Sequence, residues 1–217
     1  MEIEALFRQY SIKTHPVVKF KSWLPLDLSA DNTALSTIDL NSEIAFGNFI
    51  FDQIKASDKA VGIGGYGENR DLYSRSDLFE GEEPRTIHLG IDIWAKAGTQ
   101  VYCPFDGEVH SFANRNTHGD YGPVIILKHQ FDNHLFYSLY GHLSKTSIDI
   151  LEVGHKFFTG DRLATMGKYE ENFHWPPHLH FQLMKDIESF SGDYPGVCKA
   201  SEKEKYLFNC PNPSFLI

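Results

Sequence analysis

The chain has 217 residues, of which 41% are hydrophobic and 14% aromatic, which is enough apolar bulk to bury a sizeable core. Its 29 acidic side chains outnumber the 20 basic ones, giving a formal net charge of −9. This balance excludes the basic surface on which non-specific binding to nucleic acid or anionic membranes depends. No apolar run approaches the roughly 18 residues of a membrane span, and the first residues lack a signal-peptide pattern. We therefore expect a soluble, cytoplasmic protein with no nucleic-acid or membrane partner.

Residues 1–80 form an irregular leading region with few predicted elements. The segment His15–Phe20 (HPVVKF) is a candidate strand. Residues 41–56 predict a helix with Ser42 as its N-cap, because apolar residues recur there at helical spacing (Phe46, Phe49, Ile50, Ile54). The glycine-rich run 62–67 (GIGGYG) fits G-x-G-x-x-G, but no apolar helix follows it. A flexible loop is therefore favoured over a dinucleotide fingerprint.

From Thr86 to Met184, short β-type runs alternate with turns rich in Gly, Asp and Pro. This pattern predicts an all-β sandwich or barrel. Two segments within it, GTQVYCPFDGEVHSF and GHKFFTGDRLATMG, resemble each other weakly, as two hairpin units of one sheet system would. The polar tail from Asp186 is expected to wrap the surface.

Cysteine and histidine differ in what they indicate. The three cysteines contain no C-x-x-C pair, which favours unpaired thiols over a disulfide framework. A disulfide bridge between Cys198 and Cys210 remains open. Cys103 lies on an apolar strand, so its thiol is expected to be inert. Of eleven histidines, all except His15 fall between His88 and His180. This clustering favours a metal or acid–base site.

The first motif is His88-Leu89-Gly90-Ile91-Asp92. On one strand, His88, Gly90 and Asp92 would share a face, while Leu89 and Ile91 would point into a core. Gly90 would leave open space between an imidazole and a carboxylate, which together can hold a metal ion. A polar strand face meeting solvent is the alternative.

The second motif is His178-Leu179-His180, whose strand is amphipathic through Gln182. Two imidazoles on one rigid strand can serve as one metal ligand and one acid–base group. Structural histidines are the alternative.

The third motif ends the segment 134–143 at His142, where alternation places His142 on one face with Phe136, Ser138 and Tyr140. His134 would lie about 26 Å away along a strand, too far to share a site, and we expect it at the surface. The other histidines lack a partner pattern and are expected to be structural or solvated (His110, His118, His129, His155, His174).

Together the motifs offer two imidazoles and one carboxylate as ligands, with two imidazoles to spare. Three ligands of this type with an open fourth position are how catalytic zinc is held. The spare histidines would then orient water, accept its proton and bind an oxyanion. The sequence contains no H-E-x-x-H, G-x-S-x-G or P-loop pattern that would favour another chemistry.

The motifs H-x-x-x-D, Y-G-H-L and P-H-L-H-F, in this order, resemble the lysostaphin-type (LytM-like) zinc metallopeptidases, the glycyl-glycine endopeptidase family. The similarity extends over about residues 85–184. It implies a mostly β fold, an antiparallel β-sheet groove of the duplicated hybrid (barrel-sandwich hybrid) type. It also implies cleavage of peptide bonds, often in bacterial cell-wall peptides. The implied Zn²⁺ ligands are His88, Asp92 and His180, and the implied catalytic pair is His142 and His178.

We predict three regions: an N-terminal extension (1–80) with one or two short helices that caps the groove, a metallopeptidase domain (81–190) and a C-terminal tail (191–217). Bulky residues stand where the family commonly has a small glycine-rich turn before its H-x-H (Phe173, His174, Trp175). A narrower or reshaped groove would accept something other than the usual wall peptide, so a cell-wall-type peptide and a different substrate both stay open. Similar modules occur in larger cytoplasmic chains, so association with other enzyme modules is expected.

Two alternatives to a zinc endopeptidase stay open. One is a non-hydrolytic zinc-binding or regulatory module on the same fold, although such a module would be expected to have lost at least one of the five motif residues. The other is a cytosolic amide hydrolase that acts on a non-wall substrate. A phosphate or biotin carrier with a related sheet is disfavoured, because no carrier motif surrounds Lys168, the only lysine near a suitable hairpin tip.

Overall fold

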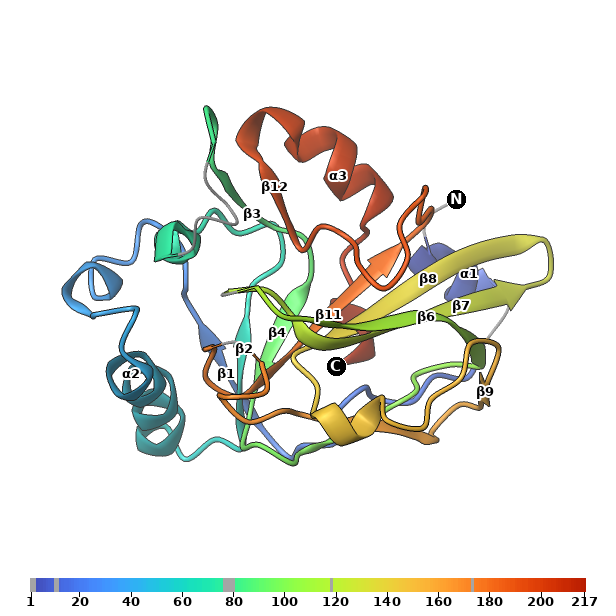
Figure 1. The fold of residues 1–217 in the computed structure, drawn as a ribbon, viewed down its shortest axis with the longest axis horizontal. Coiled ribbons are helices and arrows are strands. Elements are labelled where there is room, and N and C mark those ends of the chain that lie inside the picture. Colours follow the sequence, from blue (N-terminus) through green and yellow to red (C-terminus); the bar gives the residue numbers. More distant parts are fainter. Residues whose placement is uncertain (1–2, 10–11, 76–80, 118, 173) are drawn as a thin grey trace.

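The computed structural model describes residues 3–9, 12–75, 81–117, 119–172 and 174–217. One open sheet of eight strands dominates it, beside two sheets of two strands each (Figure 1). The elements, in chain order, are α1 (Ile3–Gln9), β1 (Trp23–Leu26), α2 (Glu43–Ala56), β2 (Val61–Gly64), β3 (Arg85–His88), β4 (Ile91–Trp94), β5 (Gln100–Tyr102), β6 (Gly107–Arg115), β7 (Gly122–Phe131), β8 (His134–Gly141), β9 (Lys156–Phe157), β10 (Arg162–Thr165), β11 (His178–Met184), β12 (Val197–Lys199) and α3 (Lys203–Asn209). The mostly β fold with helices in its N-terminal region is confirmed. No helix of the described segments has the length and apolarity needed to cross a membrane.

The large sheet brings distant motifs together. Its order is β1-β2-β4-β11-β8-β7-β6-β9, and every neighbouring pair is antiparallel except β1 with β2. At the centre, His180 of β11 pairs with Asp92 of β4 on one side and with Gly141, the last residue of β8, on the other. Three motifs that are far apart in the sequence therefore meet at one point of the sheet.

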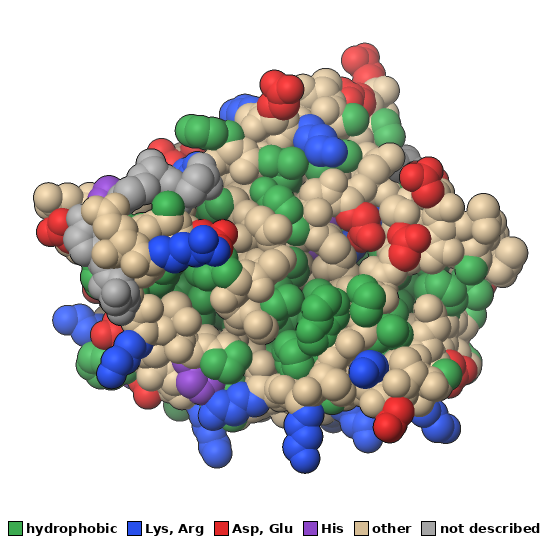
Figure 2. Space-filling model, turned by 180° about the vertical axis from the view of Figure 1, so that it is seen from behind, with side chains coloured by type: hydrophobic (Ala, Val, Ile, Leu, Met, Phe, Trp, Pro, Cys, Tyr) green, Lys and Arg blue, Asp and Glu red, His purple; other side chains and the backbone are tan. Residues whose placement is uncertain are grey.

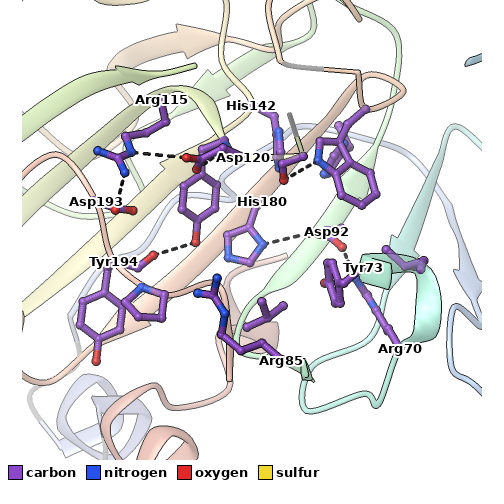
Figure 3. Close-up of a pocket in the computed structure, with 18 of the residues that line it drawn as sticks. Arg70, Tyr73, Arg85, Asp92, Arg115, Asp120, His142, His180, Asp193 and Tyr194 are labelled. Carbon is purple, nitrogen blue, oxygen red and sulfur yellow. Dashed lines mark hydrogen bonds and ion pairs between the residues drawn. The ribbon is translucent and has the colours of Figure 1, made fainter. Parts of the chain in front are cut away.

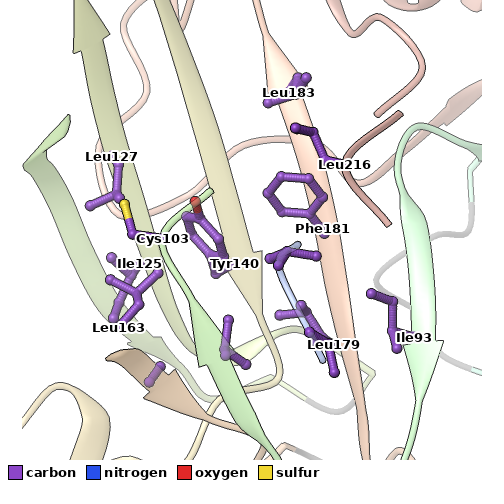
Figure 4. Close-up of a cluster of buried hydrophobic side chains, with 14 of the residues drawn as sticks. Ile93, Cys103, Ile125, Leu127, Tyr140, Leu163, Leu179, Phe181, Leu183 and Leu216 are labelled. Carbon is purple, nitrogen blue, oxygen red and sulfur yellow. The ribbon is translucent and has the colours of Figure 1, made fainter. Parts of the chain in front are cut away.

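Both faces of this central region are covered by apolar side chains. On one face, Leu179, Phe181 and Leu183 of β11 point into the largest core cluster (Figure 4). On the other, Leu139 and Met184 belong to a second cluster. Full burial of one such side chain stabilises the fold by about 1.5–3 kcal/mol. The packing on both faces therefore makes this the rigid part of the molecule on which the site is built.

Helix α2 begins and ends close to the predicted bounds. The Ser42 hydroxyl accepts a hydrogen bond from the Ala45 backbone N–H, as an N-cap does. The apolar side of the helix packs into a third cluster that also contains Trp94 of β4 (Phe46, Ile50, Ile54). The N-terminal region therefore packs directly against a strand of the site.

Two predictions for the N-terminal region are wrong. His15–Phe20 is not a strand, although Val17 is buried, because its backbone bonds go to two separate partners, Leu216 and Tyr102, instead of one ladder. The first part of the glycine-rich run is strand β2, buried between β1 and β4, and not a flexible loop. A Cβ at Gly62 would lie within 3.0 Å of the Leu26 and Ile54 side chains, so glycine permits the close approach.

The C-terminal tail does more than wrap the surface. Strand β12 pairs with β3, and Cys198, Cys210 and Leu216 are buried in the two main clusters. All three cysteines are free thiols. The two weakly similar hairpin segments pair with each other, β5 with β10 and β6 with β9.

Candidate metal and catalytic site

His88 and Asp92 come from two strands and not from the single strand predicted. His88 ends β3, which pairs with β12, whereas Asp92 lies in β4, which pairs with β2 and β11. Between them the chain changes sheets, so Leu89 packs in a different cluster from Ile91. The turn still leaves His88 Nε2 only 3.2 Å from Asp92 Oδ1.

The His180 ring and the Phe181 carbonyl fill the space in front of Gly90. A Cβ at this position would lie 2.9 Å from the His180 ring and 2.6 Å from the Phe181 carbonyl oxygen. The glycine therefore makes room for the third predicted ligand, so the space is not an open gap.

The three predicted ligands, His88, Asp92 and His180, meet in a small triangle. His88 Nε2 lies 3.0 Å from His180 Nδ1, and Asp92 Oδ1 lies 3.2 Å and 3.1 Å from these two atoms. In a tetrahedral zinc site with bonds of about 2.0–2.1 Å, neighbouring ligand atoms lie about 3.3–3.4 Å apart. The three donors are of zinc-binding type, and their spacing is close to what the ion requires.

In His88 and His180, one ring nitrogen donates a hydrogen bond on the side away from Asp92, so the other ring nitrogen carries no proton. His88 donates from Nδ1 to the Gly65 carbonyl at 2.8 Å. His180 Nε2 donates to Gln182 Oε1 at 3.0 Å, and the amide orientation follows because Gln182 Nε2 donates to the Pro195 carbonyl. Both imidazoles therefore present a lone pair, not a proton, toward the Asp92 carboxylate.

The charge states agree with this arrangement. Burial, with Arg70 nearby, lowers the pKa of His88 to about 4, so its ring is neutral at pH 7. Burial alone raises the pKa of the Asp92 carboxyl, but the Arg70 guanidinium beside it holds this pKa well below its usual value. An ionised carboxylate thus faces the neutral His88 ring and the bare Nδ1 of His180, an arrangement that a cation between them stabilises.

His142 and His178 lie beside this triangle with their ring centroids 4.0 Å apart. The face predicted for His142 is wrong, because Phe136 and Tyr140 of β8 point into the large core. His142 follows the strand end with a left-handed φ of 61°, which turns its ring to the opposite face. A bulky residue rarely adopts this conformation, and such strain gathers at functional sites.

The nitrogens of this histidine pair have different surroundings. His178 donates from Nδ1 to the Pro176 carbonyl at 2.8 Å, which leaves Nε2 as an acceptor. Its ring stacks on Trp94 at 4.1 Å between centroids, and burial lowers its pKa to about 4. Burial, followed by the neighbouring His178, also lowers the pKa of His142. The buried His142 Nδ1 has no hydrogen-bond partner among the described residues.

A pocket opens onto Asp92, His142, His178 and His180, with His88 behind them. Figure 3 shows Arg70 and Tyr73 on one side of the His180 ring and Arg115 with Asp120 and Asp193 on the other. All five predicted site side chains are at most 5% exposed. Accordingly, histidine is sparse on the surface face in Figure 2. Four of the five site residues therefore line a pocket and are almost completely buried.

Several residues of the site were not identified from the sequence. Tyr73 lies in the short 3₁₀-helix Asp71–Arg75, and Arg70 directly precedes this helix. The segment has no hydrophobic periodicity that could have indicated either residue. Trp175, by contrast, is one of the bulky residues expected to reshape the groove, and it does line the pocket. It packs against Tyr73 and both catalytic-type histidines, and its indole N–H donates to the Gly119 carbonyl at 2.9 Å. Gln182 could have been found, because it shares the face of His178 and His180 on the amphipathic strand.

The remaining histidines follow expectation. His129 is buried and bonds to the Asp106 carbonyl and the Ser138 hydroxyl, which is a structural role. His110 and His134 are half-buried, His155 and His174 are exposed, and His118, like Phe173, lies outside the described residues. Burial raises the pKa of the Cys103 thiol to about 12, as expected for an inert cysteine.

Among solved structures, the chain is similar to two peptidases over about half of its length. It is 26% identical to a zinc-containing peptidase from Vibrio cholerae, covering 45% of this chain and 27% of that one, with a TM-score of 0.37. It is 27% identical to the catalytic domain of the antimicrobial peptidase lysostaphin from Staphylococcus simulans, covering 55% and 80%, with a TM-score of 0.39. The chain thus spans about a quarter of the first structure's length. A comparison with curated proteins gave no match.

Peptidase family M23 is the family whose sequence profile matches, over residues 86–191. This segment contains all five predicted site residues and most strands of the large sheet. The resemblance to the LytM-like peptidases is therefore confirmed over residues 86–191, where the chain matches peptidase family M23.

Proposed function

We propose that this protein is a zinc-dependent metalloendopeptidase whose ion is held by His88, Asp92 and His180. The observation that carries the proposal is the convergence of two imidazole lone pairs and one carboxylate oxygen within 3.0–3.2 Å of one another. Without a cation these acceptors repel, whereas a Zn²⁺ ion would bind all three. The match of residues 86–191 to peptidase family M23 supports the same assignment.

When bound, zinc supplies Lewis acidity, which polarises a carbonyl and makes water a nucleophile at neutral pH. The chain would supply three ligands, and four of the five site residues line the pocket, which leaves room for a substrate. A site with three protein ligands and one open position is of the catalytic type.

His178 is suited to accept the proton of the attacking water. Its Nδ1–H is held by the Pro176 carbonyl, so Nε2 offers a lone pair, and its lowered pKa keeps the ring neutral. As the water oxygen attacks the amide carbon, its proton passes to this nitrogen and then to the departing amine as the C–N bond breaks. His142, whose Nδ1 has no partner among the described residues, is placed to donate to the developing oxyanion.

The walls of the pocket favour a narrow substrate segment. Trp175 and Tyr73 are 4% and 7% exposed and pack against each other on the side of the N-terminal region. These side chains leave no wide groove beside the two histidines. We propose that the substrate is a peptide with small residues at the cleaved bond, and that residues 1–80 cover part of the groove.

Cleavage of defined peptides tests this function. The full chain, loaded with zinc, is incubated with a set of small-residue and bulky-residue peptides, and the products are identified by mass spectrometry. We expect internal cleavage of small-residue peptides that stops on chelation, returns with zinc and is absent in His178→Gln. Cleavage that survives complete metal removal would refute the proposal. A zinc-loaded chain that cleaves none of the peptides would favour the non-hydrolytic zinc-binding module.

A further inference from the structure

Arg70 is a buried arginine in the segment that leads from β2 to β3, outside the part of the chain that matches the family. Only 1% of its surface is exposed. Its Nη1 donates to Asp92 Oδ2 at 2.6 Å, and its Nε donates to Glu68 Oε2 at 2.7 Å. Further bonds reach the Tyr73 hydroxyl at 3.2 Å and the Gly65 carbonyl at 3.3 Å. The guanidinium is therefore held on several sides.

Because of the contact with Arg70, the two oxygens of the Asp92 carboxylate have different partners. Oδ2 is engaged by Arg70, while Oδ1 lies 3.1 Å and 3.2 Å from the bare nitrogens of His180 and His88. A carboxylate free on both oxygens can approach a metal ion through either one or through both. With Oδ2 occupied, only Oδ1 faces the triangle of donor atoms.

We propose that Arg70 is a positioning residue of the zinc site, which presents Asp92 as a ligand through one oxygen only. The inference rests on the zinc site proposed above and assigns it a part outside residues 86–191. Because one carboxylate oxygen is withheld, the ion keeps a position open for water or substrate.

The same segment positions a second ligand. The Gly65 carbonyl accepts hydrogen bonds from both Arg70 Nη2 and His88 Nδ1. At Gly64, an added Cβ would lie 2.8 Å from Arg70 Nη2, so the glycine leaves space for the guanidinium. The glycine-rich run, which is not a dinucleotide site, thus has a role: its backbone and its small residues hold Arg70 and His88 in place, and through them two of the three ligands.

Lysine cannot replace this arginine fully. The planar guanidinium directs separate N–H groups to Glu68 and to Asp92, whereas an ammonium is a single point charge on a more flexible stem. Loss of a group that orients a metal ligand typically weakens metal affinity about 10–100-fold. We therefore expect this loss in Arg70→Met and a smaller one, with partial rescue, in Arg70→Lys.

The test measures zinc affinity of the full chain by competition with a chromophoric chelator, and the visible spectrum of the Co²⁺-substituted protein. Arg115→Met is the matched control, because Arg115 also faces the pocket and pairs with aspartates, Asp193 at 3.1 Å and Asp120 at 3.5 Å, that are not proposed ligands. Arg70→Met should bind zinc about 10–100-fold more weakly and show weaker Co²⁺ bands, as a second Asp92 oxygen coordinates. The control should stay within twofold of the unchanged chain.

The outcomes separate this inference from the proposed function. If the unchanged chain binds no zinc, the proposed zinc site itself is wrong. If it binds zinc and folded Arg70→Met binds within twofold with an unchanged Co²⁺ spectrum, the positioning role is overturned. Should Arg70→Met fail to fold, Arg70→Lys decides by the same two measurements: weaker binding than the control supports the role, and equal binding overturns it.

Discussion

Replacement of Gly90 by alanine should damage the site without removing any functional group. The new Cβ would lie 2.6 Å from the Phe181 carbonyl oxygen, whereas a carbon and an oxygen normally need about 3.3 Å, so something must move by about 0.7 Å. The backbone of Phe181 is fixed by its pairing with Ile91 and Tyr140. The His180 ring is a second contact, 2.9 Å from the same Cβ where about 3.5 Å is normal, so the ring must also move by about 0.6 Å.

The expected magnitudes follow from this displacement. Metal–ligand distances tolerate only about ±0.2 Å, so a shift of the His180 ring by about 0.6 Å removes it as an effective ligand. Overpacking of a buried position costs about 1–3 kcal/mol in the free energy of unfolding, even without metal. For a chain of this size, that is a fall of about 2–12 °C in the melting temperature.

The assay combines thermal melts of the metal-free protein with zinc titration. Gly47→Ala is the matched control: a Cβ there meets nothing within 4 Å, and alanine favours the helix α2 in which Gly47 lies. It should leave zinc affinity unchanged and raise stability by about 0.5–1 kcal/mol. If Gly90→Ala has the same melting temperature as the unchanged chain and a zinc affinity within twofold of it, the close contact at Gly90 does not control the site.

Two further predictions concern groups outside the zinc triangle. Burial lowers the pKa of His129 from 6.5 to about 4, so between these values the unfolded chain binds more protons than the folded one. His129 should therefore contribute about 3 kcal/mol to the stability that the metal-free protein loses as the pH falls from 6.5 to 4. His129→Gln should make this loss smaller in denaturant titrations, and an equally steep loss in the variant would contradict the prediction. Cys103, whose thiol pKa burial raises to about 12, should react with an aromatic disulfide reagent only after denaturant is added, and rapid labelling of Cys103 in the native protein would count against its burial.

The alternation of polar and apolar residues predicted the central strands of the large sheet, because one face packs into the core and the other carries the polar residues of the site. Strand β11 is the clearest case, with Leu179, Phe181 and Leu183 in the core and His178, His180 and Gln182 on the pocket side. The same reasoning failed at His88–Asp92 and at His142. In both places the strand ends within the motif, at a change of sheet or at a left-handed residue, and alternation cannot register either event.

The N-terminal contribution could not be predicted for a different reason. Arg70 reaches Asp92 from 22 positions away, through an irregular segment whose shape depends on the glycines of β2 and on the packing of Tyr73. Local pattern carries no information about such long-range contacts. The three regions proposed from the sequence remain a prediction, but β1 and β2 are strands of the same sheet as the site.

Zinc stoichiometry in five single variants tests the central claim most directly. His88→Ala, Asp92→Ala and His180→Ala each leave two ligands and should purify without zinc, because a two-ligand site binds far more weakly. His142→Ala and His178→Ala should retain one zinc per chain and lose peptide cleavage, because the proton acceptor or the oxyanion donor is gone. Full zinc in any of the first three, or an empty site in either of the last two, would contradict the division between ligands and catalytic histidines.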